Sequence, residues 1–233
     1  MAGEEKNTTQ VYGKINERGD APAPLVFVIR AHYVYGKDKE FDDTIVMGDT
    51  YPFKDLLKKH GFSWASALYL WLAHEKDIAK QIAEELRKAG AEVIEVSRLL
   101  PDIMEYDIVK KRVVELIERG VIKEAVEISK ELSKMKEYPE HTLLPFELQM
   151  RYIAHAILKK YQLNMDFEDV LKKMIEGQIG EEKGWLAKER LQKLAKIYVK
   201  SRDLGLTDLP CALISAIHVI YEFDFERKRQ VMR

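Results

Sequence analysis

The hydrophobic pattern of this 233-residue chain changes character near Arg98. Between residues 24 and 97, short runs rich in Val, Ile, Tyr and Phe alternate with segments of helical hydrophobic period. The first pattern predicts strands and the second predicts helices. Beyond Arg98 only the helical period remains. We therefore predict an α+β fold, with a small, mostly antiparallel sheet and two helices on one face, followed by an all-α domain.

The sheet region predicts the element order β-β-α-β-β-α-β. The runs "LVFVIRAHYVYG" and "TIVMG" are the first two strands. The segment "DTYPFKDLLKKHG" is a helix, with Pro52 in its first turn and Gly61 at its end. The runs "FSW" and "ALYLWLA" then form a hairpin, and "HEKDIAKQIAEELRKAG" and "AEVIEV" close the domain as a helix and a strand.

The chain divides into three parts on this pattern. Residues 1–23 are a flexible N-terminal segment, residues 24–98 are the α+β domain, and residues 99–233 are the helical domain. Helices are expected at residues 106–119, 122–136, 144–161, 167–176, 184–202 and 209–223.

Composition narrows the class of protein. The single cysteine, Cys211, excludes an internal disulfide and fits a reducing compartment. The first residues carry no apolar stretch of a signal peptide, and no run approaches the roughly 18 apolar residues of a membrane span. We expect a cytoplasmic protein without membrane contact. Charged residues make up 33% of the chain and are mostly Lys and Glu, as in proteins from hot environments.

Motifs for catalysis or metal binding are missing from the sequence. The six histidines show no metal-ligand spacing, and His155 and His218 lie in apolar helical segments, where a core role is expected. No glycine-rich phosphate loop and no nucleophile elbow is present. We therefore expect a protein that is not an enzyme and needs no cofactor or metal.

The aromatic residues of the first domain can be sorted by strand phase. In the first strand the fully apolar row that begins at Leu25 is predicted to meet the helices, and the row with Arg30 and His32 is predicted to stay open. In "ALYLWLA" the leucines belong inside. Tyr69 and Trp71 should then share the open face, and Trp64 should join them if no bulge intervenes.

An open face with Trp, Tyr, Arg and His is typical of proteins that bind single-stranded nucleic acid. Bases stack on the aromatic rings, and the cations hold phosphates. Two alternatives remain at this point. The face could be a second hydrophobic layer under the helical domain, or it could be a protein interface. Stacking also does not separate DNA from RNA.

The segments "GDTYPFKDLLKKHGFSWASALYLWLA" and "EKDIAKQIAEELRKAGAEV" resemble the ThermoDBP-related single-stranded DNA-binding proteins of thermophilic archaea. The resemblance covers about residues 24–97, and its most specific piece is "TYPFKDLLKKHGFSW". It implies a curved sheet that forms a cleft with an aromatic floor and basic edges. It also implies sequence-independent binding of single-stranded DNA, and a homo-oligomer (dimer or tetramer) assembled through the helical domain.

By position, the floor would draw on the aromatic residues of the predicted hairpin and the edge on nearby cations. Residues 21–98 carry eleven Lys and Arg against twelve Asp and Glu, a net charge of −1, where a basic excess is usual. This balance favours binding dominated by stacking, or a channel between subunits. The predicted nucleic-acid-binding residues are Arg30, His32, Lys37, Lys39, Trp64, Tyr69 and Trp71.

Overall fold

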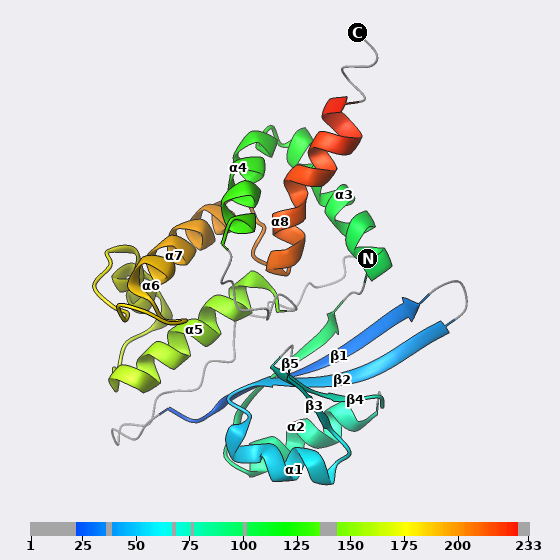
Figure 1. Ribbon diagram of the computed structural model, residues 1–233, viewed down its shortest axis with the longest axis vertical. Helices are drawn as coiled ribbons and strands as arrows, with labels where there is room; N and C mark the ends of the chain where they lie inside the picture. The colour runs from blue at the N-terminus through cyan, green and yellow to red at the C-terminus, as the bar shows by residue number, and fades with distance from the viewer. Residues whose placement is uncertain are drawn as a thin grey trace, which may run out of the picture.

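The computed structural model describes residues 22–35, 39–66, 69–75, 77–99, 102–135 and 144–227. Its sheet has five strands in the order β3-β4-β2-β1-β5 (Figure 1). The predicted α+β class and the predicted order of strands and helices are confirmed. The strands are β1 (Leu25–Tyr35), β2 (Lys39–Gly48), β3 (Ser63–Ala65), β4 (Leu70–Ala73) and β5 (Glu92–Leu99).

The sheet is antiparallel except at one edge, where β1 and β5 run parallel. This exception follows from the connection, because helix α2 (Ile78–Lys88) lies between β4 and β5 and carries the chain back across the sheet. The apolar residues of α2 recur at helical spacing and face the sheet. Gly90 follows the helix with a φ of 93°, the left-handed conformation in which helices commonly end.

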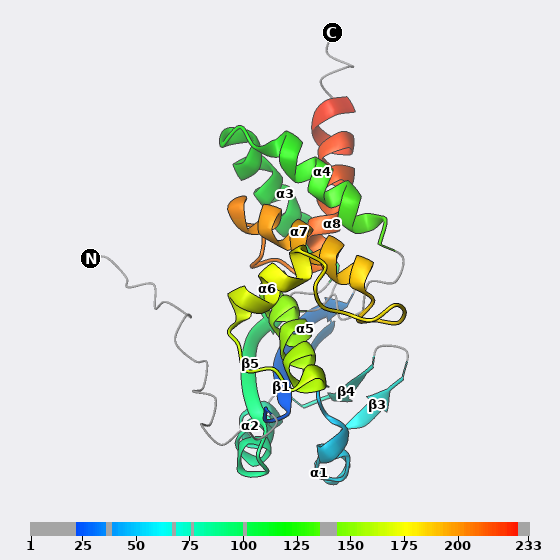
Figure 2. The same cartoon turned by 90° about the vertical axis from the view of Figure 1, so that its left-hand side faces the viewer.

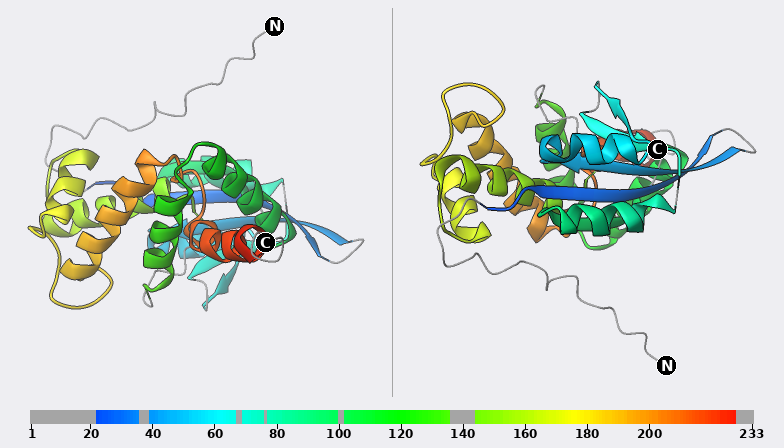
Figure 3. Two further views of the ribbon diagram at one scale, coloured as in Figure 1. Left: turned by 90° about the horizontal axis from the view of Figure 1, so that it is seen from above. Right: turned by 90° about the horizontal axis from the view of Figure 1, so that it is seen from below.

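Helices α1 (Lys54–Lys59) and α2 cover one face of the sheet, below the strands in Figure 1 and on the near side in the right-hand view of Figure 3. A 3₁₀ turn, Tyr51–Phe53, leads into α1. His60 at the end of α1 bonds Glu85 of α2 at 2.8 Å, which ties the two helices together.

The prediction of which row meets these helices was wrong. Paired residues of neighbouring strands share a face, and Val28, Val46 and Trp71 form one row across β1, β2 and β4. This is the row whose phase includes Arg30, and it packs against α1 and α2. Trp71 is only 6% exposed. Both rows of β1 are apolar where the strand begins, so phase predicted which residues share a face and not which face the helices cover.

Helix α5 (Phe146–Tyr161) covers the other face. Leu148 and Tyr152 pack on the row that contains Phe27, Ile29 and Leu70. The opposite side of α5, with residues such as Phe146 and Met150, enters the core of the helical region. Figure 2 shows α5 between the sheet and the other helices. The helical domain therefore does form a second hydrophobic layer, although on the row that had been expected to meet the local helices.

The remaining helices surround a single apolar core, in which Cys211 is buried. Each predicted helix is confirmed to within about one helical turn at its ends. No helix in the described part of the chain is long and apolar enough to cross a membrane. The helices are α3 (Asp102–Glu118), α4 (Ile122–Ser133), α6 (Phe167–Ile175), α7 (Lys188–Asp203) and α8 (Cys211–Ile220), which continues as a π-helical turn, Tyr221–Glu226.

Candidate functional site

Exposed aromatic side chains gather around a cleft of about 460 Å³ at the end of β2. Three separate segments form its walls: the turn between β2 and α1, the β3–β4 hairpin, and helix α5. The cleft therefore lies where the sheet domain and the helical region meet. Its lining residues are Gly48, Asp49, Thr50, Tyr51, Pro52, Trp64, Tyr69, Tyr152 and Lys159.

The first wall depends on Gly48. This residue has a φ of 102°, and a Cβ atom there would lie 2.5 Å from the carbonyl oxygen of Leu25. Only glycine fits both conditions. The chain then turns, and the amide of Asp49 donates to that same carbonyl at 2.9 Å. The turn leaves Tyr51 with 79% of its surface exposed, and Lys54 places its Nζ 4.9 Å from the centre of the Tyr51 ring.

The hairpin wall arranges three aromatic rings from the inside outward. Trp64 and Trp71 are directly paired between β3 and β4, with ring centroids 5.3 Å apart. The buried Trp71 donates from Nε1 to the hydroxyl of Thr50 at 3.2 Å. Trp64 is 44% exposed, and Tyr69 is 65% exposed and meets Trp64 edge to face at 6.5 Å. The inner tryptophan thus supports the outer one.

Tyr69 has a strained backbone. Its φ of 51° lies in the left-handed region, which costs a residue with a Cβ on the order of 1–3 kcal/mol. Such conformations cluster at ligand sites, where the surrounding structure holds them in place. Here the conformation holds the Tyr69 ring at the mouth of the cleft, against Trp64.

Helix α5 contributes Tyr152 and Lys159. The Tyr152 ring meets Phe27 of β1 edge to face at 5.9 Å. Burial, together with the negative charge of Asp49, raises the pKa of Tyr152 to about 12, so the phenol is neutral at ordinary pH. Lys159 donates to the Asp49 carboxylate at 2.8 Å and links α5 to the turn after β2.

The electrostatics of the cleft are mixed. Lys54 and Lys159 bring positive charge to its walls, and Asp49 brings negative charge. Lys58 and Lys59 are exposed on α1 next to this wall in sequence. The Lys159–Asp49 pair is partly exposed, and ion pairs of this kind contribute little to stability. An anion could therefore replace the carboxylate at Lys159 at small cost.

The predicted site residues fall into three groups. Trp64 and Tyr69 line the cleft together, and Trp71 lies beneath them in the core and not on an open face. Arg30 is exposed but does not line the cleft, because it pairs with Thr44, away from the Gly48 end of β2. The side chains of the three remaining residues, His32, Lys37 and Lys39, lie outside the described part of the structure.

Sequence reasoning missed Tyr51, Tyr152 and Lys159 as site residues. Tyr51 belongs to the "TYPFKDLL" segment, where an aromatic residue just before a proline at a helix start was a visible signal. Tyr152 and Lys159 lie on one stripe of α5 with Leu148, at spacings of four and seven residues. That second stripe, opposite the core stripe of Phe146, was the available signal that α5 contacts two layers.

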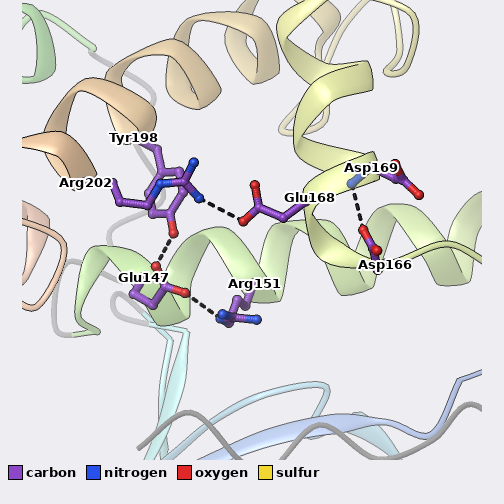
Figure 4. Close-up of polar contacts among 7 residues, drawn as sticks. All are labelled: Glu147, Arg151, Asp166, Glu168, Asp169, Tyr198 and Arg202. Atoms are coloured by element: carbon purple, nitrogen blue, oxygen red, sulfur yellow. Dashed lines mark hydrogen bonds and ion pairs between the residues drawn. The ribbon is translucent and has the colours of Figure 1, made fainter. Parts of the chain in front are cut away.

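A separate polar cluster joins α5, α6 and α7 (Figure 4). Glu147 accepts hydrogen bonds from the Tyr198 hydroxyl and, at 2.6 Å, from Arg151 Nε, and Arg202 donates to Glu168 at 2.8 Å. Tyr198 is buried, and burial together with the Glu147 bond raises the pKa of its phenol. The charged groups of the cluster pair with one another, Glu147 with Arg151 and Glu168 with Arg202. We interpret this cluster as a structural tie between helices.

The described residues contain no group of three or more His, Cys, Asp or Glu side chains that could hold a metal ion. No protein-family model matches the chain, and no match was found among curated proteins or solved structures. The geometry of the cleft and the sequence pattern are therefore the basis for assigning a function.

Proposed function

We propose that this protein binds single-stranded DNA, with little sequence preference, by stacking bases on the aromatic side chains of the cleft. The observation that carries the proposal is the exposure of Tyr51, Trp64 and Tyr69 around one cleft. Clustered, exposed aromatic surface of this kind marks a binding site. Every base has a flat face, so stacking tolerates all sequences and stabilises binding by about 1–3 kcal/mol per base.

Trp64 is the central platform in this proposal. Its indole is the largest exposed ring of the cleft, and it packs on Trp71, which is itself bonded to the Thr50 hydroxyl. Tyr69 meets it edge to face, and Tyr51 lines the same cleft. A ring that is already in position loses little conformational entropy when a base stacks on it.

Lysines of the two walls neutralise phosphates. Lys159 exchanges its Asp49 partner for a phosphate oxygen, and Lys54, Lys58 and Lys59 offer further cations along α1. Few phosphates are neutralised in this way, so affinity falls only gently as salt concentration rises. The protein performs no chemistry on its ligand in this proposal. The resemblance of residues 24–97 to ThermoDBP-related proteins implies the same function.

The test is the substitution Trp64→Ala, measured by fluorescence anisotropy with a labelled oligo-dT. Loss of one stacked base predicts an affinity weaker by roughly 5- to 150-fold. The control is Tyr106→Ala, which removes an aromatic residue of similar exposure, 46%, from helix α3. An unchanged affinity in folded Trp64→Ala protein would overturn the proposal.

Competition separates the alternatives. Unlabelled single-stranded DNA should displace the probe, and duplex DNA of equal length should not, because its bases are already stacked on one another. Displacement by matched RNA at equal concentration would instead assign the cleft to RNA or to both nucleic acids. Failure of all three to bind would leave a protein partner as the occupant of the aromatic cleft.

A further inference from the structure

We infer that the nucleic-acid path continues from the cleft onto the helical region, with Trp185 as a second stacking platform. The inference rests on the proposed function, because the cleft is one end of the path. It assigns a role to the loop between α6 and α7, which lies outside the sheet domain.

Tyr152 connects the two platforms. It lines the cleft together with Trp64 and Tyr69. Trp185 stacks on the same tyrosine, with ring centroids 6.4 Å apart and planes inclined by 18°. The aromatic surface of the cleft therefore extends over Tyr152 to Trp185. Trp185 is 44% exposed, the same fraction as Trp64.

The loop that presents Trp185 is well anchored. The amide of Glu181 donates to the carbonyl of Leu186 at 2.9 Å, and the Leu186 side chain is buried beside Trp185 in the chain. Gly180 has a φ of 127°, and a Cβ atom there would approach the Lys188 backbone to 2.8 Å. These contacts hold Trp185 in a defined position, as a stacking platform requires.

Two consecutive lysines of α5 form ion pairs near the two platforms. Lys159 bonds Asp49 on the cleft side, and Lys160 bonds Glu181 on the loop side. Both pairs are partly exposed, so each lysine can exchange its carboxylate partner for a phosphate at low cost. A strand that stacks on Trp64 and then on Trp185 would pass these two cations between the platforms.

A purely structural role for Trp185 accounts less well for these facts. A tryptophan that only fills a core is mostly covered, as Trp71 is. Trp185 has its neighbour Leu186 inside the core, whereas nearly half of its own surface is exposed. The exposed ring has the same character as Trp64 and contacts the same tyrosine that lines the cleft.

The chain has three tryptophans, which permits a direct test in the full-length protein. In Trp64→Phe, the emission comes from the buried Trp71 and from Trp185. We expect a long oligo-dT to quench this emission, because a base stacks on Trp185. In the reciprocal variant, Trp185→Phe, quenching by the long oligomer should come from Trp64.

Affinity measurements complete the test. Trp185→Ala should weaken binding of a long oligo-dT about tenfold, or about 1.4 kcal/mol. It should leave binding of a short oligomer that fills only the cleft unchanged. Trp185→Phe, which keeps an aromatic ring, should recover most of the lost affinity. Circular dichroism checks that each variant is folded.

The outcomes separate the two proposals. If Trp64→Ala weakens binding and Trp185→Ala binds long oligomers like the unmodified protein, the extension is wrong and the cleft remains. If neither substitution changes affinity, the proposed function itself is wrong. Equal losses on short and long oligomers in Trp185→Ala would also overturn the extension, because a distorted cleft explains that pattern.

Discussion

The two faces of the sheet are both covered, but by elements of different origin. Helices α1 and α2 belong to the same 75-residue stretch as the strands and pack on the row that contains Trp71. Helix α5 comes from the helical region and packs on the row that contains Phe27. The cleft forms where the edges of these two coverings meet, at the end of β2.

This difference shows how an aromatic site can arise without an open sheet. Among the described side chains, the apolar rows on both faces are covered, one by α1 and α2 and the other by α5. The site is instead lined by rings from three segments at the edges of these coverings: Tyr51 from the turn before α1, Trp64 from the hairpin and Tyr152 from α5. A ligand in this cleft would contact both coverings and would stabilise their contact.

The largest expected effect comes from a substitution that disrupts the packing of α1 and α2 on the sheet. Trp71→Ala removes a buried indole and its bond to Thr50, and we expect the free energy of unfolding to fall by about 3–5 kcal/mol. Urea denaturation followed by circular dichroism measures this loss. Trp64→Ala, on the directly paired residue, should cost much less stability because its ring is half exposed. Equal losses in the two variants would contradict the assignment of Trp71 to support and Trp64 to the surface.

A pH-dependent effect tests the covering by α5. One ring nitrogen of His155, Nε2, is buried without a hydrogen-bond partner among the described residues. Burial lowers the pKa of His155, and this outweighs the opposite effects of Asp49 and Glu92. The unfolded chain, with a histidine pKa of about 6.5, therefore takes up a proton at higher pH than the folded protein does.

The contribution of neutral His155 to the free energy of unfolding is thus fully present above the unfolded pKa. It declines as the pH falls towards the lower pKa of the folded protein. We expect the free energy of unfolding, measured in urea, to drop between about pH 7.5 and pH 5.5. His155→Leu should show a smaller drop over the same interval. Carboxylates affect both proteins alike, so identical drops would mean that His155 is not held neutral at this contact.

The smallest expected effect concerns the ion pair between Lys159 of α5 and Asp49 in the turn after β2. Lys159→Ala should lower stability by less than about 1 kcal/mol, because its pair with Asp49 is partly exposed. The same change should flatten the dependence of log affinity for oligo-dT on log salt concentration by about 0.7. Asp49→Asn is the matched variant and should tighten binding at low salt. An unchanged salt slope in Lys159→Ala would exclude a phosphate contact there.

Several features of the fold and the cleft could be predicted from local pattern. Strand period predicts a hairpin in which Trp64 and Trp71 share a face if no bulge intervenes, and the structure pairs the two residues directly. The position of Trp71 could not be predicted in the same way. Val26 and Val28 make its row as apolar as the row of Phe27, so period alone could not identify the one that faces α1 and α2.

The cleft shows the same division. Sequence pattern alone predicted that the second strand ends at Gly48, and that Trp64 shares a face with Tyr69 if no bulge intervenes. The burial of Trp71 and the contribution of Tyr152 and Lys159 to the site depend on long-range packing. Periodicity follows from the geometry of neighbouring residues in one element. Which row meets α1 and α2 and which meets α5 depends on how apolar surface is buried over the whole sheet, and α5 begins more than 70 residues beyond Trp71 in the chain. No local pattern contains that information.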